Sequence, residues 1–127
     1  MPYIHLRFLR VAVLYLLAGM GLGLAMGISE NHSMFPAHAH INLVGWASFA
    51  IYGLIYRAYP TAAASRLAVW HFWIANAGAL LMVVGIAGIN NGMEQFKPVT
   101  AGGAILTILG ALVFATILFR TSAAQNQ

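Results

Sequence analysis

Long apolar runs separated by short polar stretches dominate the pattern of this sequence. A hydrocarbon layer about 30 Å thick needs roughly 20 apolar residues per spanning helix. Runs of that length predict four membrane-spanning helices, at about residues 6–28, 37–59, 67–89 and 99–119. The connections are short, so helices that follow one another in sequence are expected to pack antiparallel. The pattern predicts an all-α integral membrane four-helix bundle that forms a single domain over residues 1–127.

Charged residues are rare, and they are divided unequally between the ends of the predicted helices. Only 6% of the residues are charged and 61% are hydrophobic, whereas soluble domains are roughly 25% charged. One set of helix ends carries Arg7, Arg10, Arg57, Arg66 and Arg120. The opposite ends carry Lys97, Glu30 and Glu94. The positive-inside rule predicts that both termini face the cytoplasm. We expect the protein to lie in the inner membrane.

This placement of charge also narrows the classes of function. The formal net charge of +4 comes from residues beside hydrophobic segments, so orientation in the membrane explains it better than nucleic-acid binding does. The sequence has no cysteine, which excludes disulfides, thiolate-bound zinc, iron–sulfur clusters and covalent attachment of haem. Any redox chemistry therefore needs a non-covalent cofactor.

A stripe of glycines predicts how the helices meet. Gly19, Gly23 and Gly27 recur every four residues along the first predicted helix. Small residues at this spacing let a second backbone approach closely. We interpret the stripe as a packing surface, and we expect glycine-rich helix faces to join identical copies into a homo-oligomer.

Two histidines, His38 and His40, open the second predicted helix near the outer face of the membrane. Ionisable residues within spans are candidates for function, because a buried imidazole without a partner is costly. Successive helical residues are separated by about 100°, so these two side chains point about 200° apart and cannot bind one metal ion together. Imidazole is a ligand for haem iron, copper and zinc. An apolar groove favours non-covalent haem b, with copper as the alternative.

Two further residues of this helix are candidates for contact with a cofactor. Gly45 leaves room beside the helix, and Trp46 offers aromatic surface to a large ring. Ordinary helix packing is the alternative interpretation for both residues.

Other polar residues in or near the predicted helices have less specific interpretations. His71 lies among tryptophans near the inner end of the third helix and is interpreted as an interfacial anchor. Tyr52, Tyr56 and Tyr59 fit an interfacial aromatic belt. The amide of Asn42 is expected to hydrogen-bond to another helix or to a ligand.

Asn76 carries the same expectation as Asn42. Of the remaining histidines, His32 lies in the outer loop, where it is placed to reach an outward-facing cofactor, and His5 is expected to be solvated.

The second and third predicted helices resemble a known family. The second combines His38-Ala39-His40 with Gly45-Trp46 and ends at Tyr56-Arg57-Ala58-Tyr59-Pro60. It resembles the tenth helix of the catalytic subunit of haem-copper oxidases, and most closely that of the C-type oxidases and nitric oxide reductases. The third, from His71-Phe72-Trp73 to Asn90-Asn91-Gly92-Met93, is similar to their next helix.

The resemblance implies roles for the two histidines, but it extends to only one part of the family's catalytic subunit. It implies that His38 binds a high-spin haem and His40 a low-spin haem, on opposite sides of one helix. The catalytic subunit of the family has three pseudo-symmetric arcs of four helices, and its other arcs supply the copper ligands and the second axial ligand of the low-spin haem. This chain matches one arc, and its copper-site ligands are not found, so oxidoreductase activity is left open. Identical copies, most simply a trimer, would complete the arrangement.

These observations predict a small membrane b-type haem protein for electron transfer or for binding oxygen or nitric oxide, with its redox partner unidentified. Two axial histidines give a low-spin electron carrier, whereas one histidine and an open position bind a diatomic gas. The alternative is a copper- or zinc-binding or assembly protein that uses the same histidines, with support from the thioethers of Met20, Met26 and Met34. A purely structural subunit is a third interpretation.

Overall fold

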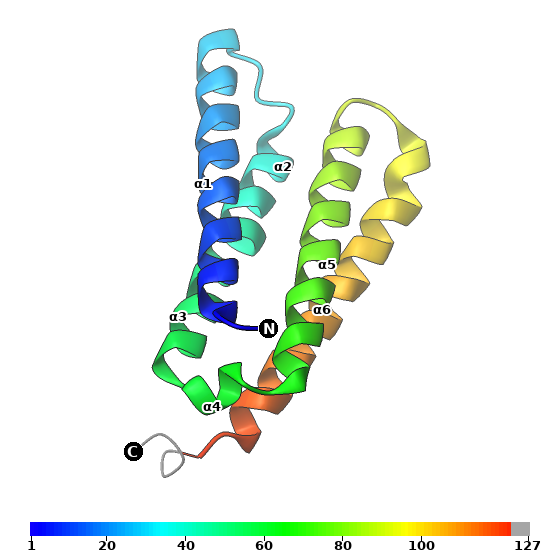
Figure 1. Cartoon of the computed structure of the whole chain (residues 1–127). Coiled ribbons are helices and arrows are strands. Elements are labelled where there is room, and N and C mark those ends of the chain that lie inside the picture. Colours follow the sequence, from blue (N-terminus) through cyan, green and yellow to red (C-terminus); the bar gives the residue numbers. More distant parts are fainter. Residues whose placement is uncertain (123–127) are drawn as a thin grey trace.

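The computed structural model describes residues 1–122, which form two helical hairpins (Figure 1). In the first hairpin, α1 (Ile4–Ser29) packs against a second span made of α2 (Phe35–His40), the π-helix η1 (Ile41–Ala47) and α3 (Ser48–Ala58). In the second hairpin, α5 (Arg66–Asn90) packs against α6 (Lys97–Arg120). The short helix α4 (Pro60–Ala63) joins the hairpins, and the 3₁₀ helix η2 (Glu94–Phe96) precedes α6.

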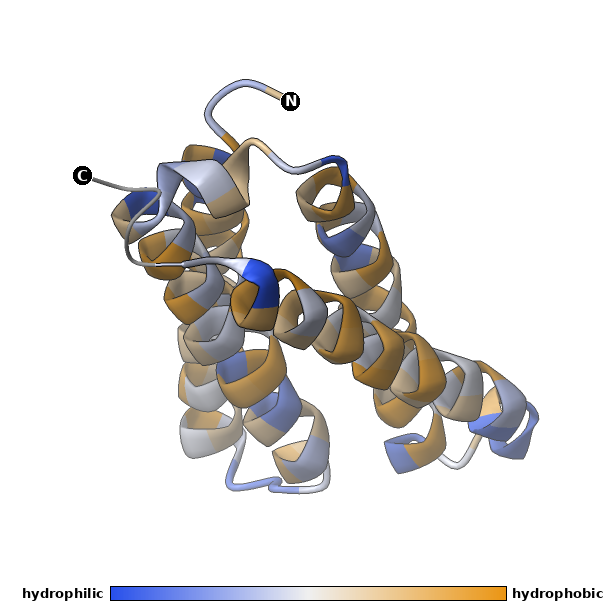
Figure 2. Ribbon diagram, turned by 90° about the horizontal axis from the view of Figure 1, so that it is seen from below, coloured by the Kyte–Doolittle hydropathy of each residue, from blue (hydrophilic) through white to orange (hydrophobic). Residues whose placement is uncertain are grey.

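The prediction of four spanning helices is confirmed. Four helical segments are long and apolar enough to cross a membrane: Ile4–Ser29, Phe35–Ala58, Arg66–Asn90 and Glu94–Arg120. Large apolar side chains remain exposed along them, including Leu24 and Ile105. Figure 2 shows apolar residues on all sides of the long helices. A helix that is apolar all round suits a lipid environment, and four of them indicate an all-α multi-pass membrane protein.

The two ends of the molecule differ in charge. We call one end the loop end, because it carries the connections at residues 30–34 and 91–93, and the other the terminal end, because it carries the start of α1, α4 and the end of α6 (Figure 1). The five arginines all lie toward the terminal end, within the first turns of α1 and α5 or the last turns of α3 and α6. The direction in which these ends face across the membrane stays a prediction.

Local sequence signals account for the helix starts. Pro36, Pro60 and Pro98 each lie in the first turn of a helix, where the missing N–H costs no hydrogen bond and the fixed φ suits the helix. The N-cap of α5 is Ser65, whose Oγ accepts a hydrogen bond from the backbone N–H of Leu67 at 3.1 Å.

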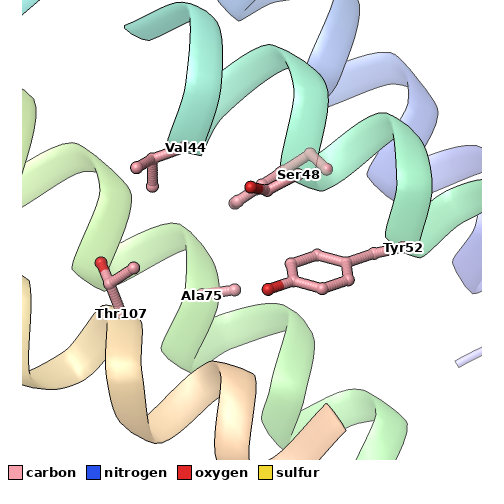
Figure 3. A pocket seen from close by; sticks show the side chains of 6 residues that line it. Val44, Ser48, Tyr52, Ala75 and Thr107 are labelled. Carbon is pink, nitrogen blue, oxygen red and sulfur yellow. The ribbon is translucent and has the colours of Figure 1, made fainter. Parts of the chain in front are cut away.

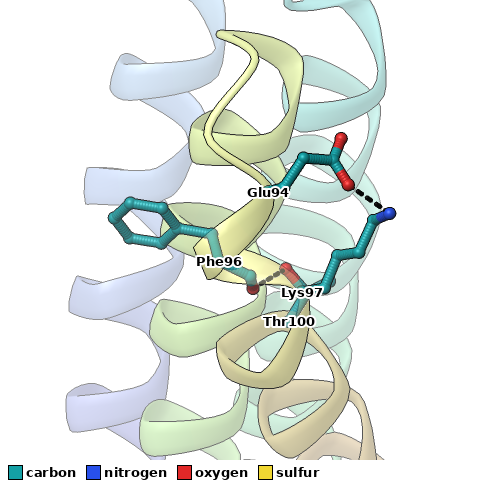
Figure 4. A network of polar contacts seen from close by, with 4 residues as sticks. All are labelled: Glu94, Phe96, Lys97 and Thr100. Atoms are coloured by element: carbon teal, nitrogen blue, oxygen red, sulfur yellow. Dashed lines mark hydrogen bonds and ion pairs between the residues drawn. The ribbon is translucent and has the colours of Figure 1, made fainter.

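The start of α6 is fixed by a small polar network at the loop end (Figure 4). The Thr100 hydroxyl donates to the backbone carbonyl of Phe96 at 3.0 Å, and Lys97 forms an ion pair with Glu94. Both side chains of the ion pair are about two-thirds exposed, at 65% and 68%. The pair therefore marks the end of the bundle rather than holding it together.

In the first hairpin, small residues on one helix face large residues on the other. A methyl group added at Gly23 would lie 3.0 Å from Cε1 of His38, and one added at Gly19 would lie 2.6 Å from Oδ1 of Asn42. At Gly45 the small residue is on the second span and the large one on α1, because a methyl group added at Gly45 would overlap the ring of Tyr15. The predicted packing role is therefore confirmed for Gly19 and Gly23.

Gly27, the third member of the predicted glycine stripe, faces open space with no other atom within 4 Å of an added methyl group. The same is true of Gly21 and Gly102. Assembly of identical copies through glycine-rich faces stays a prediction, and it would have to use such open positions rather than Gly19 and Gly23.

In the second hairpin, the backbones of α5 and α6 lie close together along the length of the two helices. Gly78 and Gly85 of α5 face Thr107 and Thr100 of α6, and Gly103 of α6 faces the backbone at Met82. The two helices approach closely because these positions lack a side chain. This contact makes α5 the best buried of the four spans.

An aromatic core joins the two hairpins toward the terminal end. Phe8 of α1 is fully buried and contacts the rings of Phe49, Tyr52, Tyr56, His71 and Phe72. Ring centroids in these pairs lie 4.9–5.7 Å apart, within the usual range for attractive aromatic pairs. These ring contacts therefore hold the two hairpins together at this end of the molecule.

Candidate cofactor-binding site

The histidine pair lies where the second span changes its helical geometry. His38 and His40 occupy the last turn of α2, and the π-helix η1 begins with the next residue. In a π-helix the backbone bonds run from i to i+5, and such segments are frequent at functional sites. At its end, the backbone N–H and the hydroxyl of Ser48 both donate to the carbonyl of Leu43, the hydroxyl at 2.8 Å. The apolar run predicts a regular α-helix here, so the π-helix of residues 41–47 corrects that prediction.

His38 lies inside the first hairpin. Its ring faces Gly23 of α1, and its side chain is half-buried. The Asn42 side-chain amide donates to the backbone carbonyl of His38 at 2.9 Å and lies 3.4 and 3.5 Å from its two ring nitrogens. The ring is thus held between α1 and the first residues of η1.

His40 is oriented by its own helix. Nδ1 of His40 lies 2.7 Å from the backbone carbonyl oxygen of Pro36, and a carbonyl can only accept, so Nδ1–H is the donor. This bond fixes the tautomer and leaves the lone pair of Nε2 available. Within residues 1–122, Nε2 of His40 takes part in no hydrogen bond. An imidazole with one nitrogen bonded to a carbonyl and the other free is the usual arrangement of a metal-binding histidine.

The described residues do not form a multi-ligand metal centre. Within residues 1–122, no group of three or more His, Cys, Asp or Glu side chains is placed to hold a metal ion. His32 is exposed in the loop-end connection. His5 is half-buried beside the ring of Tyr3, with centroids 6.3 Å apart, so it is less solvated than the sequence suggested. If His40 binds a metal ion, it is therefore a single imidazole ligand rather than part of a cluster of ligands within residues 1–122.

The surroundings of Gly45 and Trp46 are explained by packing within the chain. Gly45 is buried, and the Tyr15 ring fills the space beside it that was predicted to admit a cofactor. Trp46 packs partly buried against the aromatic core. Contact of either residue with a cofactor stays a prediction.

His71 is a core residue rather than an interfacial anchor, so that prediction is wrong. Its side chain is 0% exposed, and its Nδ1 lies 2.8 Å from the Tyr56 hydroxyl. The rings of Phe8 and Phe114 lie 4.9 and 5.2 Å from the imidazole at shallow angles, and Tyr52 lies 4.4 Å away at a steep angle. These three aromatic rings surround the imidazole and separate it from the membrane surface.

The hydrogen bond between Tyr56 and His71 has a preferred direction. Among the residues that the structure describes, Nε2 of His71 has no hydrogen-bond partner. If the Tyr56 hydroxyl donates to Nδ1, only Nε2–H is left unpaired, and aromatic faces accept such groups weakly. The reverse direction would also leave the hydroxyl hydrogen without an acceptor. We therefore assign Tyr56 as the donor.

Two other polar predictions are corrected by the same contacts. Tyr56 is 1% exposed and belongs to the core, whereas Tyr59, at 38%, is the exposed member of the predicted aromatic belt. The side-chain amides of Asn42 and Asn76 donate to carbonyls one turn earlier in their own helices, at His38 and Phe72. Within residues 1–122 neither amide donates to another helix, and a hydrogen bond from either one to a ligand stays a prediction.

Comparison with known proteins adds a distant relation. The chain is 27% identical to the protein named cytochrome c oxidase subunit 1 homolog, bacteroid, of Bradyrhizobium diazoefficiens, over an alignment of 132 positions. That alignment includes 80% of this chain and 24% of the relative, so the chain spans about a quarter of the relative's length. No family model and no solved structure matches. The similarity supports a distant, partial relation to haem-copper oxidases.

Proposed function

We propose that this chain binds haem b non-covalently within the membrane, with Nε2 of His40 as an axial ligand. The observation that carries the proposal is the geometry of His40: Nδ1 is bonded to the Pro36 carbonyl and Nε2 is free. The relation to an oxidase subunit supports haem rather than a bare metal ion. We place the site near the outer face of the inner membrane, because the arginines lie at the opposite end.

The residues around His40 fit a flat apolar ring. Leu43 lies about one turn after His40 and exposes a large apolar side chain, at 66%, whereas the exposed ring of Phe35 lies beside His38, with centroids 6.4 Å apart. A haem bound there supplies one-electron exchange at iron or, with an open axial position, binding of oxygen or nitric oxide. The residues of this chain orient the imidazole, through Pro36, and shield the ring from water.

Assembly of identical copies deepens the proposal. His40 offers one ligand, and closed cyclic symmetry is the usual way for identical chains to complete a shared site. We propose a trimer, in which a second copy either supplies the other axial ligand or encloses the open position. A monomer that retains stoichiometric haem in detergent would contradict this assembly while leaving haem binding itself intact.

The test is a reduced-minus-oxidised visible spectrum of the purified protein, produced with ample haem. The wild type should give a b-type spectrum that His40→Ala loses and that the control variant His5→Ala, at the opposite end of the molecule, retains. A shift on addition of carbon monoxide identifies a gas binder, and its absence identifies an electron carrier. A colourless wild type, or a spectrum unchanged by His40→Ala, would contradict the proposal.

One observation favours the copper alternative. Met26 and Met34 line the same cavity of about 260 Å³ at the loop end, together with Asn91. The Asn91 amide donates to the sulfur of Met34 at 3.3 Å. Thioethers favour cuprous ions, whereas Met20, at 61% exposed, lies away from this cavity. Metal analysis showing stoichiometric copper, lost in a Met26→Leu and Met34→Leu double variant and kept in Met20→Leu, would favour this function over haem binding.

A further inference from the structure

A small cavity lies between the second, third and fourth spans. Its volume is about 50 Å³, and it is lined by Val44, Ser48, Phe49, Tyr52, Ala75 and Thr107. Ser48 lies roughly 15 Å along the helix from the end of α3, and Ala75 roughly 14 Å from the start of α5, at 1.5 Å per residue. In a hydrocarbon layer about 30 Å thick, the cavity is therefore near the middle of the membrane.

The hydroxyl groups around this cavity are not all satisfied. The Ser48 hydroxyl donates its hydrogen to the Leu43 carbonyl at 2.8 Å, which leaves lone pairs on Oγ. The Tyr52 side chain is half-buried, and its hydroxyl forms no hydrogen bond within residues 1–122. Figure 3 shows the Tyr52 side chain extending toward Ala75, with Ser48 one turn away on the same helix. A phenol hydrogen without an acceptor is costly in hydrocarbon.

The unpaired groups define what the cavity can hold. A suitable ligand must accept a hydrogen bond from the Tyr52 hydroxyl and donate one to Oγ of Ser48. Water does both, and the volume suffices for one or two molecules. A diatomic gas of similar size has no hydrogen to donate and is a poor acceptor, so it would leave both groups unsatisfied. We infer that this partly open cavity is a water site, in which water bridges Tyr52 and Ser48 near the centre of the membrane.

The water site also touches the aromatic core. The Tyr52 ring lies 4.4 Å from the His71 ring. A water bonded to the Tyr52 hydroxyl therefore also holds in place one of the rings that surround the buried imidazole. Thr107 closes the cavity from α6, with its own hydroxyl donating to the Gly103 carbonyl at 2.9 Å. The inference concerns a different part of the chain from His40 and does not depend on haem.

Two measurements test this inference. Infrared spectra of the wild type should contain a water O–H band that shifts in H₂¹⁸O, and Tyr52→Phe should abolish it. The matched control is Tyr59→Phe, which removes an exposed phenol hydroxyl away from the cavity and should keep the band. Absence of the band from the wild type, or its persistence in Tyr52→Phe, would overturn the inference.

The second measurement uses xenon, which enters dry apolar cavities. Xenon-pressurised crystals of the wild type should show no xenon beside Tyr52, whereas the Tyr52→Phe and Ser48→Ala double variant should show it there. Xenon in the wild-type cavity would identify an apolar gas site and overturn the assignment to water. The wild-type result is decisive by itself, even if the double variant does not fold.

Discussion

Histidine occupies opposite environments at the two ends of this molecule. At the terminal end, His71 is fully buried among four aromatic rings and bonded to Tyr56. At the loop end, His38 and His40 are half-buried, and Nδ1 of His40 is bonded to a backbone carbonyl. Burial and hydrogen-bond partners, rather than residue type, separate a structural histidine from a candidate ligand. From this comparison we expect the terminal end to contribute most of the stability, and the loop end remains the proposed place for binding.

The largest expected effect on stability is at Phe8. Phe8→Ala removes a 0% exposed ring that contacts five others, and we expect a loss of about 3 kcal/mol, the low end for buried Phe→Ala substitutions. We take the low end of the range because lipid solvates an apolar side chain about as well as the protein core does. The main cost is therefore the lost packing. The control is Phe119→Ala, whose side chain is 92% exposed. Equal effects in unfolding titrations of the two variants would contradict the division between the ends.

Tyr56→Phe should have the next largest effect. It removes the donor to Nδ1 of His71 and leaves both imidazole nitrogens buried without a partner, at a cost of about 1–3 kcal/mol. Thermal unfolding in detergent measures this loss. Adding His71→Phe should recover part of the stability, because the unsatisfied ring is then gone. No recovery in the double variant would show that the buried hydrogen bond is not the cause.

Gly23→Ala tests the loop end with a smaller expected effect. The added methyl group would lie 3.0 Å from Cε1 of His38, so the ring must move by a few tenths of an ångström at a cost of about 1 kcal/mol. The ¹³Cε1 resonance of His38 in the NMR spectrum should shift. Gly27→Ala is the matched control, since its methyl group meets no atom within 4 Å. An unshifted resonance in Gly23→Ala, or an equal shift in both variants, would place His38 away from α1.

The smallest expected effect is at the ion pair of Lys97 and Glu94. Both side chains are exposed, so Lys97→Met should change the unfolding free energy by less than about 1 kcal/mol. The change should decrease further in high salt, because exposed charges are screened. A loss as large as that of Tyr56→Phe would mean that the loop end contributes as much stability as the terminal end.

The four spans were predictable because the length and apolar character of each run reflect the thickness of the membrane. The π-helix was not, because a change from i+4 to i+5 bonding leaves no signature in an almost wholly apolar segment. For His71, Trp70 and Trp73 suggested the interface, and the structure exposes both, at 65% and 58%.

A signal for the burial of His71 did exist in the sequence. Ala68, Ala75 and Gly78 lie three residues before, four after and seven after His71, and a stripe of small residues marks the packed face of a membrane helix. The orientation of His40 had no such signal, since it depends on the hydrogen bond to the Pro36 carbonyl.

The most direct test of His40 as an axial ligand is replacement of its side chain by a free ligand. His40→Gly should lose the b-type spectrum, and added imidazole should restore it by filling the space left by the side chain. The same treatment of His38→Gly should change the spectrum little, because the His38 ring faces Gly23 within the hairpin. Haem retained by His40→Gly without imidazole would contradict the account.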